Sequence, residues 1–174
     1  MDFKSKIVLI SGPTASGKSS FAIQLAKKIN GEIINADSMQ IYKQLRIISA
    51  RPDPKKYQKI NHHLYGFHDA KKSFSTGDWL KLAKQKIKKI QKKNMIPILV
   101  GGTGLYFKTL IDGLVKIPNI PARHRKEVRN LHQRLGQREF FKRLLKIDSS
   151  YKGKINPSDS QRSIRAYEVK KFTK

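Results

Sequence analysis

The sequence predicts an α/β protein in which helices flank a parallel β-sheet and a small helical domain follows. The first observation behind this prediction is an alternation of short apolar runs with helix-like segments as far as residue 115. The second is a glycine-rich loop, SGPTASGKSS (11–20), between the first apolar run and the first helical pattern. The third is the Pro-rich segment IPNIPA (117–122), after which only helical patterns occur. We therefore expect a core over residues 1–115 and a helical domain over residues 116–174.

The strand candidates are apolar along their whole length, as strands are when both faces of a parallel sheet are buried. They are KIVLIS (6–11), EIINA (32–36), IPILVG (96–101) and, with a weaker pattern, HHLYGF (62–67). Because helical segments separate them, right-handed crossovers and a doubly wound sheet are expected.

The first two helices of the core each have one apolar face. The first follows the glycine-rich loop and should end at Gly31. Its apolar face is formed by Phe21, Leu25 and Ile29. The second contains the Lys-rich segment 81–94 and should end near Asn94 and Pro97. Its apolar face is formed by Trp79, Ala83, Ile87 and Ile90.

A third core helix is expected between Thr103, as its cap, and Gly113. Its apolar residues are Leu105, Tyr106, Leu110 and Ile111. The helical domain shows three further patterns, over residues 121–135, 137–147 and 157–172. Asn156 followed by Pro157 is a favourable start for the last of them.

The charge of the chain is strongly positive, with 38 Lys and Arg against 12 Asp and Glu and a net charge of +26. Such a field attracts polyanions, nucleic acids above all. The alternative is a lysine-rich surface that is merely solvated, but that does not explain why acids are so few. The chain has no cysteine, which excludes disulfides and thiolate metal sites. No apolar run is long enough to span a bilayer and the N-terminal segment is no signal peptide, so a cytoplasmic protein without a membrane partner is expected.

The glycine-rich loop has the spacing G-x-x-x-x-G-K-[ST] between a strand and a helix, which is typical of phosphate-binding P-loops. The glycines let backbone N–H groups converge on anionic oxygens, and the positive end of the next helix points at them. Lys18 adds a charge at the terminal phosphates, and the Ser19 hydroxyl is suited to hold Mg²⁺. The alternative is a glycine-rich turn beside a lysine. The predicted phosphate-binding residues are Gly12, Pro13, Thr14, Ala15, Ser16, Gly17, Lys18 and Ser19.

An acid is expected beside such a loop, and the strand IPILV (96–100) ends without one. Asp37 instead follows the second strand, and the carboxyl ends of parallel strands are where ligands lie. Asp37 and Thr103 should therefore flank the loop in space. The carboxylate is either a partner of Mg²⁺ or a general base, and the alternative for both residues is a helix cap. His62 and His63 could suggest a metal, but no third ligand is evident and a structural role is favoured.

With these motifs in order, the chain resembles the tRNA dimethylallyltransferases. The matching blocks are GPTASGKS (12–19), DSMQIY (37–42), ISARP (48–52), HHL (62–64), FSTGDW (74–79), VGGTGLYFKTLIDGL (100–114) and NPSDSQRSIRAYEV (156–169). The resemblance implies a P-loop NTPase-like core with a helical insertion domain. It implies that the loop holds dimethylallyl diphosphate with Mg²⁺, and that the dimethylallyl group passes to N6 of adenosine 37, beside the anticodon of tRNA. Catalytic roles are then implied for Lys18, for Asp37 as general base, and for Thr103 in the reaction channel.

The resemblance also implies a tRNA-binding surface, and a monomer that binds the anticodon stem–loop. The implied tRNA-binding residues are Asp37, Ser38, Met39, Gln40, Thr103, Arg125, Gln161, Arg162, Ser163, Ile164 and Arg165. The spacing agrees for Arg162 and Arg165, which are three residues apart and so share a helical face.

The chain departs from the family pattern in sequence and in length. The family usually has Thr, Lys and Asp where this chain has Ser49, Arg51 and Gly66. The resemblance also implies a C-terminal portion that returns to the core and lies beyond these 174 residues, so a truncated chain, a fragment and a reduced homologue are all open. Alternative interpretations are a P-loop kinase for a small metabolite, and a tRNA-binding protein without turnover. Transfer to free adenine nucleotides is a further variant, which the net charge and the QRSIRA segment (161–166) argue against.

Overall fold

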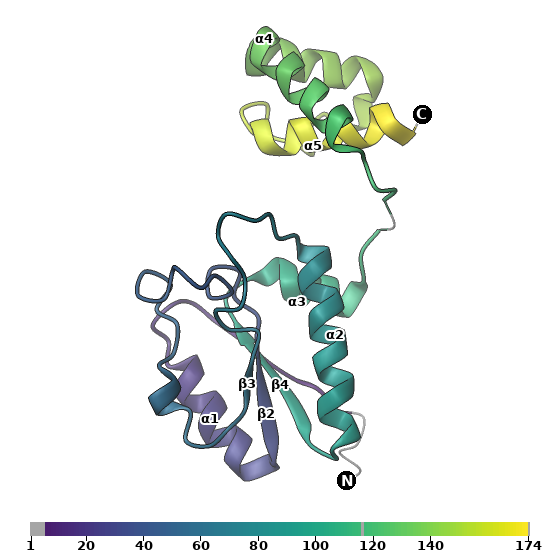
Figure 1. The fold of residues 1–174 in the computed structure, drawn as a ribbon. Coiled ribbons are helices and arrows are strands. Elements are labelled where there is room, and N and C mark those ends of the chain that lie inside the picture. Colours follow the sequence, from purple (N-terminus) through teal and green to yellow (C-terminus); the bar gives the residue numbers. More distant parts are fainter. Residues whose placement is uncertain (1–5, 116, 174) are drawn as a thin grey trace. The chain divides into compact units, whose positions relative to one another are not determined.

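The structure is a computed structural model that describes residues 6–115 and 117–173. The chain divides between residues 114 and 115 into two compact units. The elements of the first unit are β1 (Val8–Ser11), α1 (Lys18–Ile29), β2 (Gly31–Asn35), η1 (Pro54–Lys56), β3 (His62–His63), α2 (Thr76–Lys92), β4 (Ile96–Gly101) and α3 (Gly104–Asp112) (Figure 1). Those of the second unit are α4 (Ala122–Ile147), η2 (Ser149–Tyr151) and α5 (Ser160–Thr173). No helix in the described part of the chain is long and apolar enough to cross a membrane.

The first unit is built on a four-stranded sheet with the order β1-β4-β2-β3, in which all neighbours are parallel. Every residue of β2 and β4 is buried, as their continuous apolar runs predicted. The prediction of an α/β fold with a parallel sheet is confirmed. Even the weak candidate HHLYGF supplies a strand, although only His62 and His63 pair with β2.

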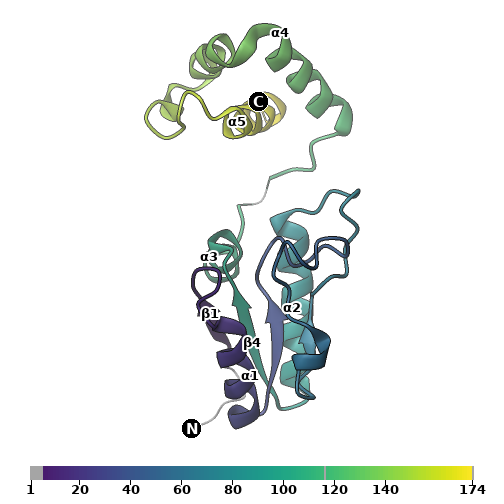
Figure 2. The ribbon, with the colours of Figure 1, turned by 90° about the vertical axis from the view of Figure 1, so that its left-hand side faces the viewer.

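Helices cover both faces of this sheet (Figure 2). On one face, α1 packs its small residues Ala22 and Ala26 against Ile33, Ile98 and Val100. On the other face, α2 and α3 enclose a core that contains Ile34, Leu64, Trp79, Leu99, Tyr106 and Phe107. All four apolar residues predicted for α2 are buried. A capping box between Ser75 and Asp78 starts that helix.

The predicted apolar faces of α1 and α3 are partly wrong. Phe21 is 56% exposed, because the sheet is contacted by Ala22, Ile23 and Ala26 one position further along the helix. Small residues at this contact let the helix approach the sheet closely. In α3, Leu105 and Ile111 are 56% and 69% exposed, whereas Phe107 and Thr109 are buried.

The end of α1 also differs from the prediction. The left-handed cap is Asn30, with φ 53°, rather than Gly31. Gly31 is the first residue of β2, and a β-carbon there would lie 2.7 Å from the Ile98 side chain. Gly31 is therefore required by the close approach of β4 and does not end the helix.

The second unit is helical, and its core is formed by Val128, Phe140, Phe141, Leu144, Ile155 and Tyr167. Helix α4 contains a break at Gly136, whose φ of 70° and ψ of 163° are not helical. The predicted segments 121–135 and 137–147 are the two arms on either side of this break. The predicted start of the last helix at Asn156-Pro157 is wrong. Asn156 forms a turn with Ser158, and α5 begins at Ser160 after Asp159, whose Oδ1 accepts from Arg162 N at 2.9 Å.

Candidate active site

The glycine-rich loop forms a tight turn between β1 and α1. Gly17 caps α1 in a left-handed conformation with φ 80°, and Ala15 also has a positive φ of 64°. A left-handed alanine costs free energy, and such conformations cluster at binding sites. They turn successive backbone N–H groups toward one side, which is the arrangement that receives anions. Helix α1 begins at Lys18 and has no acid in its first turn to oppose an anion.

The Lys18 ammonium folds back over this loop. It donates a hydrogen bond to the Pro13 carbonyl and lies 3.5 Å from Ser16 Oγ. The charge is thus already held at the mouth of the turn by neutral acceptors. It has no ion pair to break among the described residues when an anion arrives.

Asp37 is held immediately beyond the carboxyl end of β2. Its backbone N–H donates to Asn35 Oδ1 at 3.0 Å, and Asn35 Nδ2 donates to the Asp37 and Leu64 carbonyls at 2.9 and 3.1 Å. The Asp37 carboxylate accepts from Met39 N–H at 2.9 Å through Oδ1. A methyl group at Gly102 would lie 3.7 Å from the other oxygen, Oδ2. Asn35 is fully buried, so this amide fixes the loop that carries the carboxylate.

Thr103 precedes α3, but its side chain does not cap that helix. Thr103 is thus the N-cap residue of α3 by position, as predicted, without a side-chain cap bond. Its Oγ1 instead accepts from Ser38 N–H at 2.9 Å and donates to Ser38 Oγ at 3.2 Å. A β-carbon at Gly101 would lie 2.1 Å from the Ala36 carbonyl, so the ends of β2 and β4 touch backbone to backbone. The segments that carry Asp37 and Thr103 are thereby fixed to each other.

The P-loop and Asp37 line one cavity of about 190 Å³ at the carboxyl ends of the strands. Its lining residues are Thr14, Ala15, Ser16, Gly17, Lys18, Ser19, Ser20, Asp37, Gln40, Ser49, Ala50, Tyr65, Val100 and Gly101. Thr103 and Met39 are outside this lining. Asp37 therefore lies beside the P-loop, as predicted.

Sequence reasoning missed one side chain and one loop contact in this cavity. The side chain is Tyr65, and burial raises the pKa of its hydroxyl, with Tyr57 and Asp37 acting in the same direction. The other is a loop contact in which Gln40 Nε2 donates to the Ser49 carbonyl at 3.0 Å. The only sequence signal for Tyr65 was its place within the weak strand candidate HHLYGF (62–67).

Two of the departures from the family pattern meet beside the cavity. Arg51 Nη1 donates to the Tyr42 carbonyl at 3.0 Å. A β-carbon at Gly66 would lie 1.7 Å from the same Nη1 atom. Gly66 also has a positive φ of 54°. The guanidinium of Arg51 thus occupies the space that any side chain at position 66 would need.

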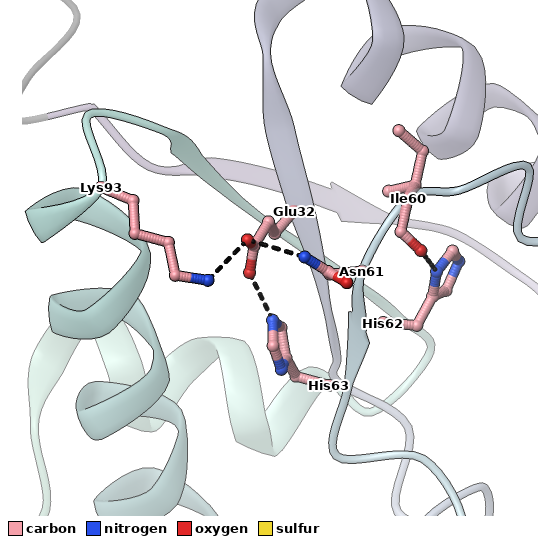
Figure 3. Close-up of polar contacts among 6 residues, drawn as sticks. All are labelled: Glu32, Ile60, Asn61, His62, His63 and Lys93. Atoms are coloured by element: carbon pink, nitrogen blue, oxygen red, sulfur yellow. Dashed lines mark hydrogen bonds and ion pairs between the residues drawn. The ribbon is translucent and has the colours of Figure 1, made fainter.

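His62 and His63 contact different partners, the Ile60 carbonyl and Glu32 respectively (Figure 3). His63 Nε2 lies 2.6 Å from Glu32 Oε2, and the second oxygen of Glu32 accepts from Asn61 and Lys93 at 3.0 Å each. His62 stacks on the Tyr57 ring at a centroid distance of 3.6 Å. No group of three His, Cys, Asp or Glu residues in the described part of the chain is arranged to hold a metal. These contacts therefore support the structural role that the sequence favoured for both histidines.

In the helical unit, most of the residues named as RNA contacts are accessible. Arg125, Gln161, Arg162 and Arg165 are exposed and Ile164 is half-buried. Ser163 is an exception, because it is fully buried, accepts from Gln137 Nε2 at 3.2 Å and donates to the Asp159 carbonyl at 2.7 Å. Its hydroxyl is used inside the unit, so this structure gives the Ser163 side chain no exposed surface for the predicted RNA contact.

The fold and the site together define a protein of the P-loop NTPase-like class. Residues 40–174 match the family model described as IPP transferase. Because that match covers more than half of the sequence, the chain belongs to the IPP transferase family.

Two curated relatives carry the name tRNA dimethylallyltransferase. The one from Pelagibacter ubique is 62% identical over 173 residues, which are 99% of this chain and 55% of the relative. The one from Rickettsia massiliae is 50% identical over 167 residues, 95% of this chain and 46% of the relative. The chain therefore spans about half the length of the curated relatives it matches.

Two solved structures are also similar to this chain. The full-length tRNA isopentenylpyrophosphate transferase from Bacillus halodurans is 37% identical with a TM-score of 0.63, over 97% of this chain and 56% of that protein. A eukaryotic dimethylallyltransferase acting on tRNA is 30% identical with a TM-score of 0.78, over 94% of this chain and 41% of that protein.

Proposed function

We propose that this protein transfers a dimethylallyl group from dimethylallyl diphosphate to N6 of the adenosine beside the anticodon of tRNA. The observation that carries the proposal is the cavity in which a P-loop and a carboxylate outside that loop face each other. The names of the relatives supply the substrate class. The tRNA and the diphosphate would meet at the carboxyl ends of the strands, in the cytoplasm where tRNA is found.

In this proposal the P-loop binds the diphosphate. The backbone N–H groups of residues 12–19 and the Lys18 ammonium would neutralise its charge. As the C1–O bond of the substrate breaks, negative charge grows on the diphosphate, and donors already aimed at it stabilise the transition state. The oxygen donors Ser19 and Asp37 line the same cavity and suit Mg²⁺, which would supply further neutralisation of the diphosphate.

Asp37 is proposed to act as the general base. The exocyclic amine of adenine is a weak nucleophile because its lone pair is delocalised into the ring. When its nitrogen bonds to C1 of the dimethylallyl group, it must lose a proton, and the Asp37 carboxylate would accept it. One carboxylate oxygen is already oriented by Met39 N–H, which leaves Oδ2 for the substrate. The base must leave its stacked position to reach this site.

The helical unit is proposed to bind the anticodon stem–loop. Its five acids, Glu127, Glu139, Asp148, Asp159 and Glu168, all form ion pairs within the unit. Ten of its described Lys and Arg residues have no such partner, namely Arg125, Lys126, Arg129, Arg134, Arg138, Arg143, Lys146, Lys152, Lys154 and Lys171. A surface of this kind attracts phosphates over its whole extent.

A single-turnover assay tests the proposal. The protein is mixed in excess with an anticodon stem–loop, labelled dimethylallyl diphosphate and Mg²⁺, and the RNA is analysed for N6-dimethylallyladenosine. We expect the label in the RNA and free diphosphate in equal amount. Stem–loop binding without transfer would instead support a tRNA-binding protein without turnover. Tight competition by ATP for the diphosphate site would support a kinase.

A further inference from the structure

A second cavity lies within the helical unit, between α4 and α5. It is an open groove of about 460 Å³. Its lining residues are Arg129, His132, Gln133, Gln161, Ile164, Arg165 and Glu168. Only the three α5 residues Gln161, Ile164 and Arg165 were implied by the family resemblance. The α4 wall is an independent feature of the structure, and it determines what the groove can bind.

The tautomer of the neutral His132 ring follows from the hydrogen bonds of its neighbour Gln137. Gln137 Nε2 donates to the Pro157 carbonyl at 2.6 Å, and a carbonyl can only accept, so this contact fixes which end of the amide is the nitrogen. Gln137 Oε1 therefore faces His132 Nε2 at 2.9 Å, and that nitrogen must be the donor. In the neutral ring, Nδ1 is then an acceptor. It has no hydrogen-bond partner among the described residues.

The remaining walls combine an apolar surface with free polar groups. The His132 ring is held edge-on against Phe140 at a centroid distance of 5.0 Å, and half-buried Ile164 lies across the groove. The side chains of Gln133 and Gln161 are exposed and form no hydrogen bond within the described structure. Each carboxamide offers both a donor and an acceptor, which is what recognition of a base edge requires.

The charges of the groove suit a nucleic acid. Glu168, the one acid in the lining, is only 4% exposed and is paired with Arg165 Nη1 at 3.1 Å. Arg129, at the opposite wall, has no ion pair in the described part of the unit and is free to meet a phosphate. The groove therefore combines a net positive rim with a partly apolar wall. That combination is typical of sites for unstacked RNA bases.

We propose that this groove binds one unpaired nucleotide of the RNA loop, separate from the adenosine that is modified. The base packs against Ile164, its edge is read by Gln133, Gln161 and His132 Nδ1, and its phosphate is neutralised by Arg129. The groove is thereby a specificity-determining subsite for loop sequence. This inference rests on the proposed RNA-binding function of the helical unit.

The test uses the full chain and a series of anticodon stem–loops in which one loop nucleotide at a time is replaced by an abasic residue. Dissociation constants are measured by fluorescence anisotropy for the wild type, Gln133→Ala and His132→Phe. The phenylalanine keeps the ring packing but removes both Nδ1 and the Nε2 bond to Gln137, so Gln133→Ala, which leaves that bond in place, is measured beside it. Gln85→Ala, which removes an exposed glutamine from α2, is the matched control.

For the wild type, we expect one abasic position besides the modified adenosine to weaken binding by about 5- to 150-fold, the range for a single stacked base. In Gln133→Ala and His132→Phe, the penalty at that same position should shrink, while penalties at other positions stay unchanged. Gln85→Ala should behave as the wild type.

The subsite is overturned if both variants keep the wild-type pattern of penalties, or if they weaken all stem–loops equally. If the wild type binds no stem–loop at all, the RNA-binding function and the subsite both fail. The single-turnover assay reports on transfer independently of this pattern.

Discussion

Lys18 is the residue whose removal should affect the diphosphate most directly. Its ammonium lies over the P-loop on neutral acceptors, so it is available to both the ground state and the transition state. We expect Lys18→Ala to weaken binding of dimethylallyl diphosphate and to lower kcat/KM together. Lys27→Ala, in the last turn of the same helix, is the control and should change neither. Unchanged diphosphate affinity in a calorimetric titration of Lys18→Ala would contradict the P-loop assignment.

A substitution at Asp37 can separate the role of its carboxylate as a general base from its role in the fold. Asparagine keeps an Oδ1 that can accept from Met39 N–H, so the loop should be preserved while the proton acceptor is lost. We expect Asp37→Asn to slow single-turnover transfer by roughly 10²–10⁴, the usual range for a positioned base. RNA affinity and thermal unfolding should be close to those of the wild type. A transfer rate near normal would leave Asp37 with a structural role only. Asp112→Asn, an exposed carboxylate on α3, is the control.

Whether a site residue could be predicted from the sequence depends on how close in the sequence its partners lie. The P-loop residues are contiguous, and their spacing alone fixes a turn at a helix start, so they could be named from the sequence. Asp37 could be named because parallel strands end at one edge of the sheet. Asn35 and Tyr65 could not, since their importance arises from a hydrogen bond to the Leu64 carbonyl and from a cavity formed by distant segments. The burial of Ser163 likewise depends on Gln137, which lies in another helix.

At the level of elements, Glu32 ties β2, β3 and α2 together. Its carboxylate is 1% exposed and bonds to His63, Asn61 and Lys93. Burial alone would raise the pKa of Glu32, but these hydrogen bonds, that of His63 first, outweigh it and lower the pKa below its ordinary value of 4.5. Since the folded pKa is lower than the unfolded one, the contribution to stability is complete above pH 4.5 and is lost as the pH falls through the folded value.

Glu32→Gln should test this contribution. At neutral pH the variant should unfold at lower urea concentration, with a loss of about 1–3 kcal/mol for the disrupted buried network. The difference from the wild type should shrink as the pH drops below 4.5, because only the wild type then loses its charge. A difference that stays constant across that range would mean that the ionised carboxylate contributes nothing. Glu139→Gln, whose exposed carboxylate pairs only with Lys142, provides the comparison.

The break in α4 should depend on a single glycine. The φ and ψ of Gly136 belong to a region that only glycine visits readily, and a β-carbon there would meet nothing within 4 Å. Gly136→Ala should therefore cost about 1–3 kcal/mol through backbone strain alone. Urea unfolding followed by far-UV circular dichroism checks this, with Arg134→Ala as the exposed control two residues away. An unchanged midpoint would show that the break is not enforced by the backbone.

The elements themselves were more predictable than their orientation. Strands that are buried on both faces leave a continuous apolar run, which is why β2 and β4 could be located. The rotation of α1 could not, because a stripe of large residues containing Phe21 competes with a stripe of small ones containing Ala22 and Ala26. Close packing against the sheet favours the small residues. The helical periodicity of the sequence does not show which of the two stripes can pack more closely.

For the molecule as a whole, the net charge of +26 predicts binding that depends strongly on salt. For loop phosphates, log K should fall with log[salt] by about 0.7 per neutralised phosphate. Arg125→Ala and Arg162→Ala should each reduce this slope by roughly one unit if they contact phosphates. Lys88→Ala, on the exposed face of α2, should have a much smaller effect. Equal losses for all three variants would indicate a diffuse polycation without a dedicated RNA surface.

The contact between Arg51 and Gly66 limits the order in which these two positions can change. Any side chain introduced at residue 66 begins 1.7 Å from the guanidinium, so residue 51 must turn away or become shorter to admit it, and the positive φ of residue 66 adds strain that this movement does not relieve. Shortening residue 51 first gives up its bond to the Tyr42 carbonyl but leaves a fold that remains open to further substitution. The two substitutions should therefore be strongly non-additive in a double-mutant cycle. For a lineage, this means that the order of the two mutations matters, because changing residue 66 first displaces the Arg51 guanidinium, whereas changing residue 51 first loses its bond to the Tyr42 carbonyl.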